Sequence, residues 1–249
     1  MFNRIDSLIP ERSLLAFPTS LSPGRRNRLP SRMLRHHLPL LIASCVGIAA
    51  LYFTRDYKDV LSRASFATAY PAMVLLVATL LVGPLNWIRK KPNPVSSDLR
   101  RDLGIWAGIL AVVHSAVGQC VHLRGRPWLY YVYGPTEHHH DFALRHDAFG
   151  FANYTGAVSA ILVITLLATS NDYSLRTLGT CEWKKVQRWN YAVFALAGVH
   201  ALLYQEAVEK QQWLFVAIVI VCVVLTAVFQ VIVFARRRSG ISRRSNGES

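Results

Sequence analysis

Two histidines, His114 and His200, stand inside long apolar segments of the 249-residue sequence. An ionisable side chain is costly at bilayer depth, so a functional role is the first hypothesis for it. His114 follows Leu103 by eleven positions, and His200 follows Trp189 by eleven. If both segments are helices that run in the same direction, each imidazole lies about 16 Å from the same membrane boundary. Two imidazoles at one level could bind one haem iron as its axial ligands.

The same residues have a simpler interpretation. A buried histidine can serve only as a hydrogen-bonding contact between helices. For either histidine alone, the hydrogen-bonding contact is the better interpretation. Because the two histidines lie at a matched depth, the haem hypothesis has equal support. His122, eight residues after His114, lies on a similar helical face. It could bind a second cofactor or assist proton or quinone transfer, or it could simply contact water at the interface.

Further histidines follow in the segment 124–147, together with two aspartates. They are His138, His139, His140 and His146, with Asp141 and Asp147. Imidazoles beside carboxylates are a plausible ligand set for Cu, Zn or Fe. Three consecutive histidines cannot easily face one ion, so a solvated loop is the alternative interpretation.

The sequence around these histidines is dominated by apolar blocks. Hydrophobic residues make up 52% of the chain, and its mean hydropathy is +0.26. Blocks of about 20 residues without a charged side chain have the length needed to cross a bilayer. Helices are expected, because lipid offers no partner for unpaired backbone groups. The predicted fold is all-α, a polytopic membrane bundle of six transmembrane helices over residues 38–54, 66–88, 103–123, 148–169, 189–205 and 212–235.

The basic residues predict the orientation of this bundle. The net charge is +14, and the Lys and Arg residues lie between and outside the apolar blocks, which favours a membrane protein over one that binds nucleic acid. Of the 28 Lys and Arg residues, 21 lie in the terminal segments and in the loops after the second and fourth helices. Both termini are therefore expected in the cytoplasm. The expected domains are a basic, partly disordered cytoplasmic tail (1–37), the six-helix domain (38–235) and a second basic cytoplasmic tail (236–249).

Other functions find no support in the sequence. The four cysteines include no CxxC pair, so neither a disulfide framework nor a thiolate metal site is expected. No GxGxxG or P-loop motif occurs, and no cytoplasmic segment is long enough for a nucleotide-binding domain. The chain is therefore expected to carry no flavin or nicotinamide domain of its own.

Two stretches resemble the ferric-reductase-like transmembrane family. Its RR-x-LG…H element is matched by Arg100-Arg101-Asp102-Leu103-Gly104 followed by His114. Its TS…LG…W..LHRL.Y…H pattern is matched by Thr169-Ser170, Leu178-Gly179, Trp183, Arg188, Tyr191 and His200. The resemblance covers the second to fifth predicted helices. Within the family, the chain is similar to the haem-binding membrane subunit of the bacterial protein-methionine-sulfoxide reductase system.

The resemblance implies electron transfer across a bacterial inner membrane through haem b, with His114 and His200 at axial-ligand positions. One departure concerns a second haem. The family has a histidine thirteen residues before the last ligand, where this chain has Gln187, and the position thirteen before His114 is Arg101. A single haem b is therefore expected. The second haem, which two-haem members of the family bind nearer the inner face, is expected to be missing or bound differently. Arg101 and Arg188 would hold its propionates, or would only anchor the helices at the cytoplasmic face.

The leading hypothesis is a membrane electron-transfer subunit rather than a self-contained enzyme. Electrons would come from a quinol or a cytoplasmic flavoprotein and leave to a metal ion, a periplasmic reductase or another acceptor on the outer side. A bound quinone could carry electrons across the distances that one haem leaves on either side of the membrane. The alternatives are a two-chain ferric reductase, or a non-redox haem or metal sensor, assembly factor or transporter that uses the histidine-bearing outer loop.

Overall fold

The computed structural model describes residues 32–54, 59–89, 98–123, 125–134, 143–207 and 213–245. In these residues the regular structure is helical, apart from one isolated bridge between Val132 and Leu144. The helices are η1 (Met33–His37), α3 (Leu38–Tyr52), α4 (Val60–Ile88), α5 (Asp98–Gly118), η3 (Pro127–Tyr130), α6 (Ala148–Thr169), α7 (Asp172–Gln187), α8 (Asn190–Ala207) and α9 (Trp213–Ser245). The prediction of an all-helical polytopic fold is confirmed for the described residues.

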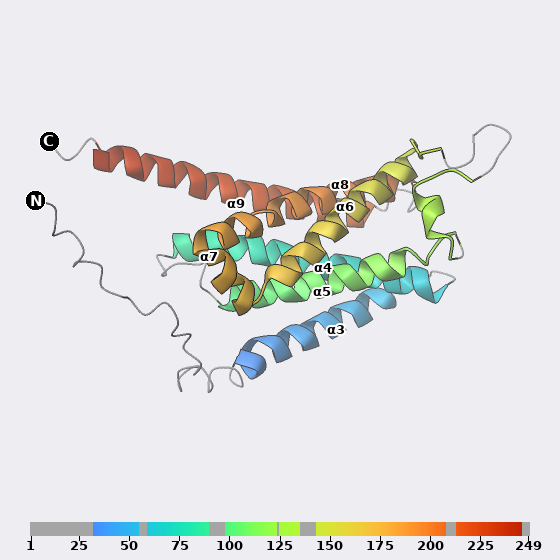
Figure 1. Cartoon of the computed structure of the whole chain (residues 1–249), viewed down its shortest axis with the longest axis horizontal. Coiled ribbons are helices and arrows are strands. Elements are labelled where there is room, and N and C mark those ends of the chain that lie inside the picture. The colour runs from blue at the N-terminus through green and yellow to red at the C-terminus, as the bar shows by residue number, and fades with distance from the viewer. Residues whose placement is uncertain are drawn as a thin grey trace, which may run out of the picture.

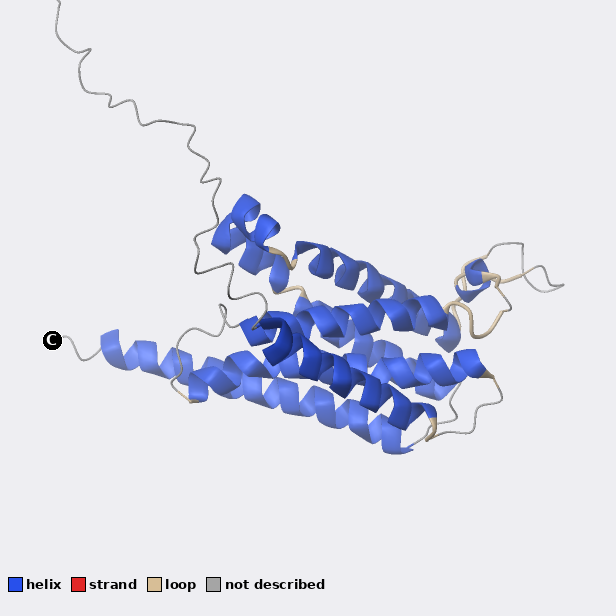
Figure 2. Cartoon of the chain, turned by 90° about the horizontal axis from the view of Figure 1, so that it is seen from below, coloured by secondary structure: helices blue, strands red, loops and turns tan. Residues whose placement is uncertain are grey.

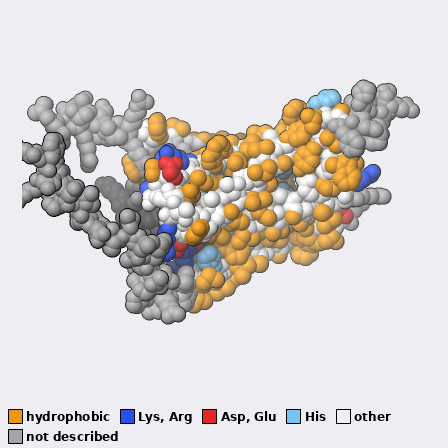
Figure 3. Space-filling model, in the orientation of Figure 1, with side chains coloured by type: hydrophobic (Ala, Val, Ile, Leu, Met, Phe, Trp, Pro, Cys, Tyr) orange, Lys and Arg blue, Asp and Glu red, His pale blue; other side chains and the backbone are white. Residues whose placement is uncertain are grey.

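The long helices run side by side, with their ends gathered at two ends of a bundle (Figures 1 and 2). The beginning of α3, the end of α9 and all of α7 lie at one end, which we call the α7 end. The segment that contains η3 lies at the opposite end, which we call the η3 end. Hydrophobic side chains cover the face between these ends, and charged ones lie near the ends (Figure 3). This distribution is expected of an integral membrane protein.

Packing is centred on α4, which contacts α3, α5, α8 and α9, while α6 packs on α5 and α8. The core is made of apolar side chains from α4, α5, α6, α8 and α9. It contains Met73, Leu76, Val77, Leu80, Ala107, Val163, Leu166, Val193, Phe194 and Val219. Four stretches of helix are long and apolar enough to cross a membrane, namely Met33–Tyr52, Val60–Ile88, Ala148–Thr169 and Trp213–Arg236. The other two predicted crossings, α5 and α8, carry more polar residues.

The helix boundaries differ from the predicted ones at several points. The first helical run begins at Met33 and α4 begins at Val60, each earlier than expected. In contrast, α5 ends at Gly118, five residues before the predicted end, and α9 continues through Ser245. Hydropathy marks the apolar stretch, whereas a helix can continue into polar flanks wherever its backbone groups find partners.

A helix that the sequence did not predict, α7, lies in the segment 170–188. It is amphipathic and has no buried residue, so its composition resembles that of a polar loop. The Asn171 side chain caps its start by accepting a hydrogen bond from the Ser174 amide at 2.7 Å. Gly179 breaks the helix with φ 72° and ψ 162°, a conformation that L side chains rarely adopt. This break turns the second half of α7 toward the bundle, where Trp183 donates to Thr169 O at 2.9 Å.

A fully buried carboxylate, that of Asp102, joins the start of the first helix to α5. Its oxygens accept two hydrogen bonds from Arg32 Nε, at 3.1 and 3.0 Å, and one from Arg32 Nη2. His36 Nδ1 lies 2.8 Å and His37 Nε2 3.3 Å from the same carboxylate. Trp106 Nε1 donates to His37 Nδ1 at 3.2 Å, which leaves Nε2 as the donor to Asp102. The segment predicted as the end of a tail is thus part of the packed structure.

We expect Asp102→Ala to lower the free energy of unfolding by about 3 kcal/mol, because it removes the buried carboxylate that pairs with the partly buried guanidinium of Arg32. Denaturant or thermal unfolding in detergent measures this change. Asp98→Ala is the matched control. Asp98 is on α5, as Asp102 is, and its carboxylate lies 3.6 Å from the Arg32 guanidinium, but its side chain is 60% exposed. Its effect should stay below about 1 kcal/mol. Equal effects of the two substitutions would show that the buried carboxylate has no special role.

Candidate functional site

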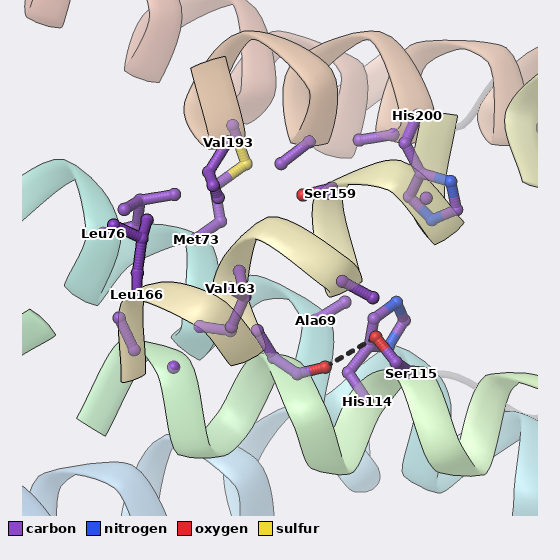
Figure 4. A pocket seen from close by; sticks show the side chains of 18 of the residues that line it. Ala69, Met73, Leu76, His114, Ser115, Ser159, Val163, Leu166, Val193 and His200 are labelled. Carbon is purple, nitrogen blue, oxygen red and sulfur yellow. Dashed lines mark hydrogen bonds between the residues drawn. The ribbon is translucent and has the colours of Figure 1, made fainter. Parts of the chain in front are cut away.

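His114 on α5 and His200 on α8 face each other across the space between these helices (Figure 4). Their ring centres lie 6.2 Å apart, and the ring planes are inclined by 68°. The structure therefore brings together the two histidines that the sequence singled out. His114 lies only four residues before the end of α5, close to the η3 end, whereas His200 lies near the middle of α8.

Each imidazole is oriented by a backbone carbonyl. His114 Nδ1 lies 3.0 Å from Ser65 O, and His200 Nδ1 lies 2.7 Å from Ala152 O. A carbonyl oxygen only accepts, so each Nδ1 carries the proton and each Nε2 carries a lone pair. This is the tautomer that binds a metal through Nε2, and an outer hydrogen bond of this kind is typical of metal-ligating histidines.

The separation of the rings suits one metal ion between them. An imidazole nitrogen binds a transition metal at about 2 Å, so two axial imidazoles on one iron have ring centres about 6 Å apart. The observed 6.2 Å agrees with this value. A direct hydrogen bond between the rings would need one Nε2 to donate, but both Nδ1 atoms already hold the proton of a neutral imidazole. The geometry thus favours the metal-ligand interpretation over a simple contact between helices.

A cavity of about 1020 Å³ extends from the histidine pair along α4, α5, α6 and α8. Small side chains form part of its lining, and this leaves room for a large flat group. They are Gly108, Ala111, Gly156, Ala157, Ala160, Ala197 and Ala201. Gly156 touches the site directly, because a Cβ built there would lie 2.8 Å from His200 Nδ1. The residues present therefore fit a haem between the helices.

The α7 end of the cavity is cationic. Arg101, Gln187 and Arg188 line it together with Arg100 and Lys184, so the predicted residues do come together. Arg101 already has partners, since its Nη1 lies 2.6 Å from Asp172 Oδ1 and its Nε donates to Ser170 O at 3.0 Å. Gln187 Nε2 lies 3.4 Å from both Thr169 Oγ1 and Ser170 Oγ. Thirteen residues, or roughly 20 Å of helix, separate Arg101 from His114. A propionate-binding role for Arg101 and Arg188 stays a prediction.

The η3 end of the cavity is polar but lacks lysine and arginine among the described lining residues. Gln119, His122, Tyr131, Tyr204 and Gln205 line it. Two of its hydrogen bonds join distant parts of the chain: Gln119 Nε2 donates to Tyr131 Oη at 2.9 Å, and Gln205 Nε2 donates to Tyr70 Oη at 3.0 Å. The two ends of the cavity thus differ in charge.

The remaining histidines of the segment 124–147 do not line this cavity within the described part of the chain. His146 is exposed, with its ring centre 5.4 Å from that of Tyr133. The preceding His138, His139 and His140, with Asp141, lie outside the described residues. In the part of the chain that is described, no group of three His, Cys, Asp or Glu side chains is placed to hold a metal ion. Nearby, the hydrogen bond from Arg145 holds the pKa of the Asp147 carboxyl below its usual range.

Sequence reasoning missed the groups that orient the histidines. Ser65 and Ala152 act through backbone carbonyls, which carry no sequence signal. Gly156 had a weak signal, because it lies in the run Gly156-Ala157-Val158-Ser159-Ala160 of mostly small residues on α6. Such a run permits close helix packing or a bound group, and only the structure distinguishes these uses.

The fold and the site together define a class, a helical membrane protein with a bis-histidine site between two of its helices. No protein-family model matches the chain. The chain is similar to proteins named protein-methionine-sulfoxide reductase heme-binding subunit MsrQ. Those of Yersinia pseudotuberculosis (strain IP 31758) and Yersinia pestis (strain Pestoides F) are each 29% identical to it over 147 residues. The matched region is 54% of this chain and 59% and 58% of these relatives, so the chain spans under two thirds of their length.

Proposed function

We propose that this chain is a haem b-binding transmembrane electron-transfer subunit. It would pass electrons from a quinol or a cytoplasmic flavoprotein to an acceptor on the outer side. The observation that carries the proposal is the histidine pair, with ring centres 6.2 Å apart and both Nδ1 atoms committed to carbonyl oxygens. The names of the relatives, which describe a haem-binding subunit of a reductase, support it.

Each part of the site has a task in this function. A bound haem supplies reversible one-electron chemistry. His114 and His200 would hold its iron through Nε2, and the carbonyls of Ser65 and Ala152 keep the rings in the orientation that this requires. Between its polar ends the cavity is lined by many apolar side chains, and such surroundings would tune the potential of a bound metal centre. The reductase in the relatives' names makes a separate reductase on the outer side a suitable acceptor.

A single haem fits this chain better than two. Arg101 and Gln187 occupy the positions thirteen residues before the two ligands, and neither is an axial ligand of haem iron. The cationic α7 end would then receive the electron donor or a bound quinone.

The proposed topology has six crossings, made by α3, α4, α5, α6, α8 and α9, with both termini in the cytoplasm of a bacterial cell. Support comes from the basic residues, 21 of 28 of which lie in segments assigned to that side. The common position of the start of α3 and the end of α9 supports it as well (Figure 1). The η3 end would face outward.

Proteoliposomes test the proposed function. Protein reconstituted around trapped ferricyanide should reduce it when a quinol, or a soluble flavin reductase with NADH, is added outside. His114→Ala protein should give only the rate of protein-free liposomes, because it lacks the redox centre. Haem-loaded wild-type protein that accepts electrons from neither donor would count against the proposal.

A further inference from the structure

The ring of His122 lies in a cluster of aromatic side chains at the η3 end. Its centre is 5.8 Å from that of Phe149, 6.0 Å from that of Tyr204 and 6.3 Å from that of Tyr130. The turn that carries it is also fixed, because the His122 amide donates to Tyr130 Oη at 2.7 Å and that hydroxyl donates to Gly118 O at 3.0 Å. His122 is therefore held at the wall of the cavity.

Tyr204 connects this cluster to the histidine pair. Its ring centre is 5.5 Å from that of His200 and 6.0 Å from that of His122, and all three side chains line the cavity. The Tyr204 ring thus neighbours both His122 and His200, an iron ligand of the proposed function. From this position His122 can respond to a charge change at the iron without binding it.

The carboxylates of a haem lie on one edge of the porphyrin, so they point toward one end of the cavity. His122 is eight residues from His114 along the chain, whereas Arg101 is thirteen residues away and is already bound to Asp172. Of the described residues that line the η3 end, His122 is the one whose side chain can become cationic near neutral pH. Gln119, Tyr131 and Gln205 add hydrogen-bonding groups beside it.

Other titratable groups surround His122 on each element that packs against it. Tyr204 approaches from α8 and Tyr130 from η3, and Asp59 at the start of α4 lies within electrostatic range of the imidazole. Phe149 of α6 also touches the ring, and the Arg145 guanidinium lies 5.0 Å from the centre of Phe149. Hydrogen bonds from Ser62 chiefly, and the charge of His122 to a smaller extent, hold the pKa of Asp59 below its usual range. An ionised Asp59 favours the protonated imidazole.

We propose that His122 binds the haem carboxylates at the η3 end and takes up a proton when the haem is reduced. The inference rests on the proposed function, since it requires a haem on His114 and His200. If a bound haem took up one electron from the donor, the imidazole of His122 would take up one proton, which hydronium or a buffer acid in the solvent would release. The positive charge lost at the iron is thereby replaced a short distance away, which makes reduction easier at low pH.

The test is the midpoint potential of the haem as a function of pH, measured on the full-length protein in detergent. Wild-type potential should fall as pH rises through the range of about 5 to 8 in which histidine titrates, by up to about 59 mV per tenfold drop in proton concentration. His122→Gln should retain the haem and remove this dependence. His146→Gln, an exposed histidine at the same end, should behave as wild type. Arg188→Gln tests the competing partner at the other end.

Several outcomes would overturn the inference. They are a pH-independent wild-type potential, an unchanged slope in haem-loaded His122→Gln, or a slope that Arg188→Gln removes instead. If His122→Gln loses its haem, proton uptake by the wild-type protein during electrochemical reduction, followed with an indicator dye, decides the question. Absence of uptake overturns the inference. Wild-type protein that binds no haem would instead refute the proposed function itself, and this inference with it.

Discussion

His114→Ala and His200→Ala should each leave a protein that folds but binds far less haem. Removing either imidazole takes away one of the two axial bonds. Even a change in the groups that orient a metal ligand costs 10–100-fold in affinity, so loss of the ligand itself should lower bound haem by at least about tenfold. Haem per chain, from the pyridine haemochrome assay, and the reduced-minus-oxidised visible spectrum measure the effect.

His146→Ala is the matched control for these variants, because His146 is an exposed histidine that does not line the cavity. It should keep the haem content and the low-spin spectrum of the wild-type protein. Size-exclusion chromatography and helical circular dichroism should show that all three variants remain folded. A folded His114→Ala or His200→Ala protein with full haem content would refute the assignment of the ligands.

Much of the site could be predicted because it depends on depth in a membrane. Hydropathy located the apolar blocks, and helical rise then placed His114 and His200 at one level without knowledge of the packing. Helical rise could not predict that the two rings point toward each other. Their directions depend on how α5 and α8 are rotated about their own axes as they pack on α6, and the packing of many small and apolar side chains determines that rotation. The same limit applies to the contact of Gly156 with His200.

The parts that could not be predicted are those made by long-range polar contacts. Asp102 was visible in the sequence only as one residue of a motif, whereas its partners Arg32 and His36 lie 70 and 66 positions earlier. Similarly, α7 has the composition of a polar loop, and its second half is held against the bundle by the bond from Trp183 to Thr169 O. Local propensity contains no information about either contact.

Gly156→Ala should reduce haem binding although it adds only one methyl group. The new Cβ would lie 2.8 Å from His200 Nδ1 and 3.0 Å from Cε1, closer than such atoms approach in proteins. The ring is rigid, so it must move away and weaken its 2.7 Å hydrogen bond to Ala152 O. Loss of that orienting bond should lower haem affinity roughly tenfold. Haem titration of the apoprotein, followed by absorbance, measures the change.

Gly104→Ala separates this effect from any general disturbance of the helices. Gly104 also lines the cavity, but its new Cβ would make only an ordinary contact, 3.5 Å from the methyl carbon of Thr79. In both variants alanine favours the helix by up to about 1 kcal/mol over glycine, so neither should destabilise the fold through helix propensity. Weaker haem binding in Gly156→Ala alone, with both proteins as stable as wild type, would therefore locate the cause at the ring of His200. Equal binding in the two variants would mean that the α6 backbone shifts to accommodate the methyl group, and that the orientation of His200 does not depend on this glycine.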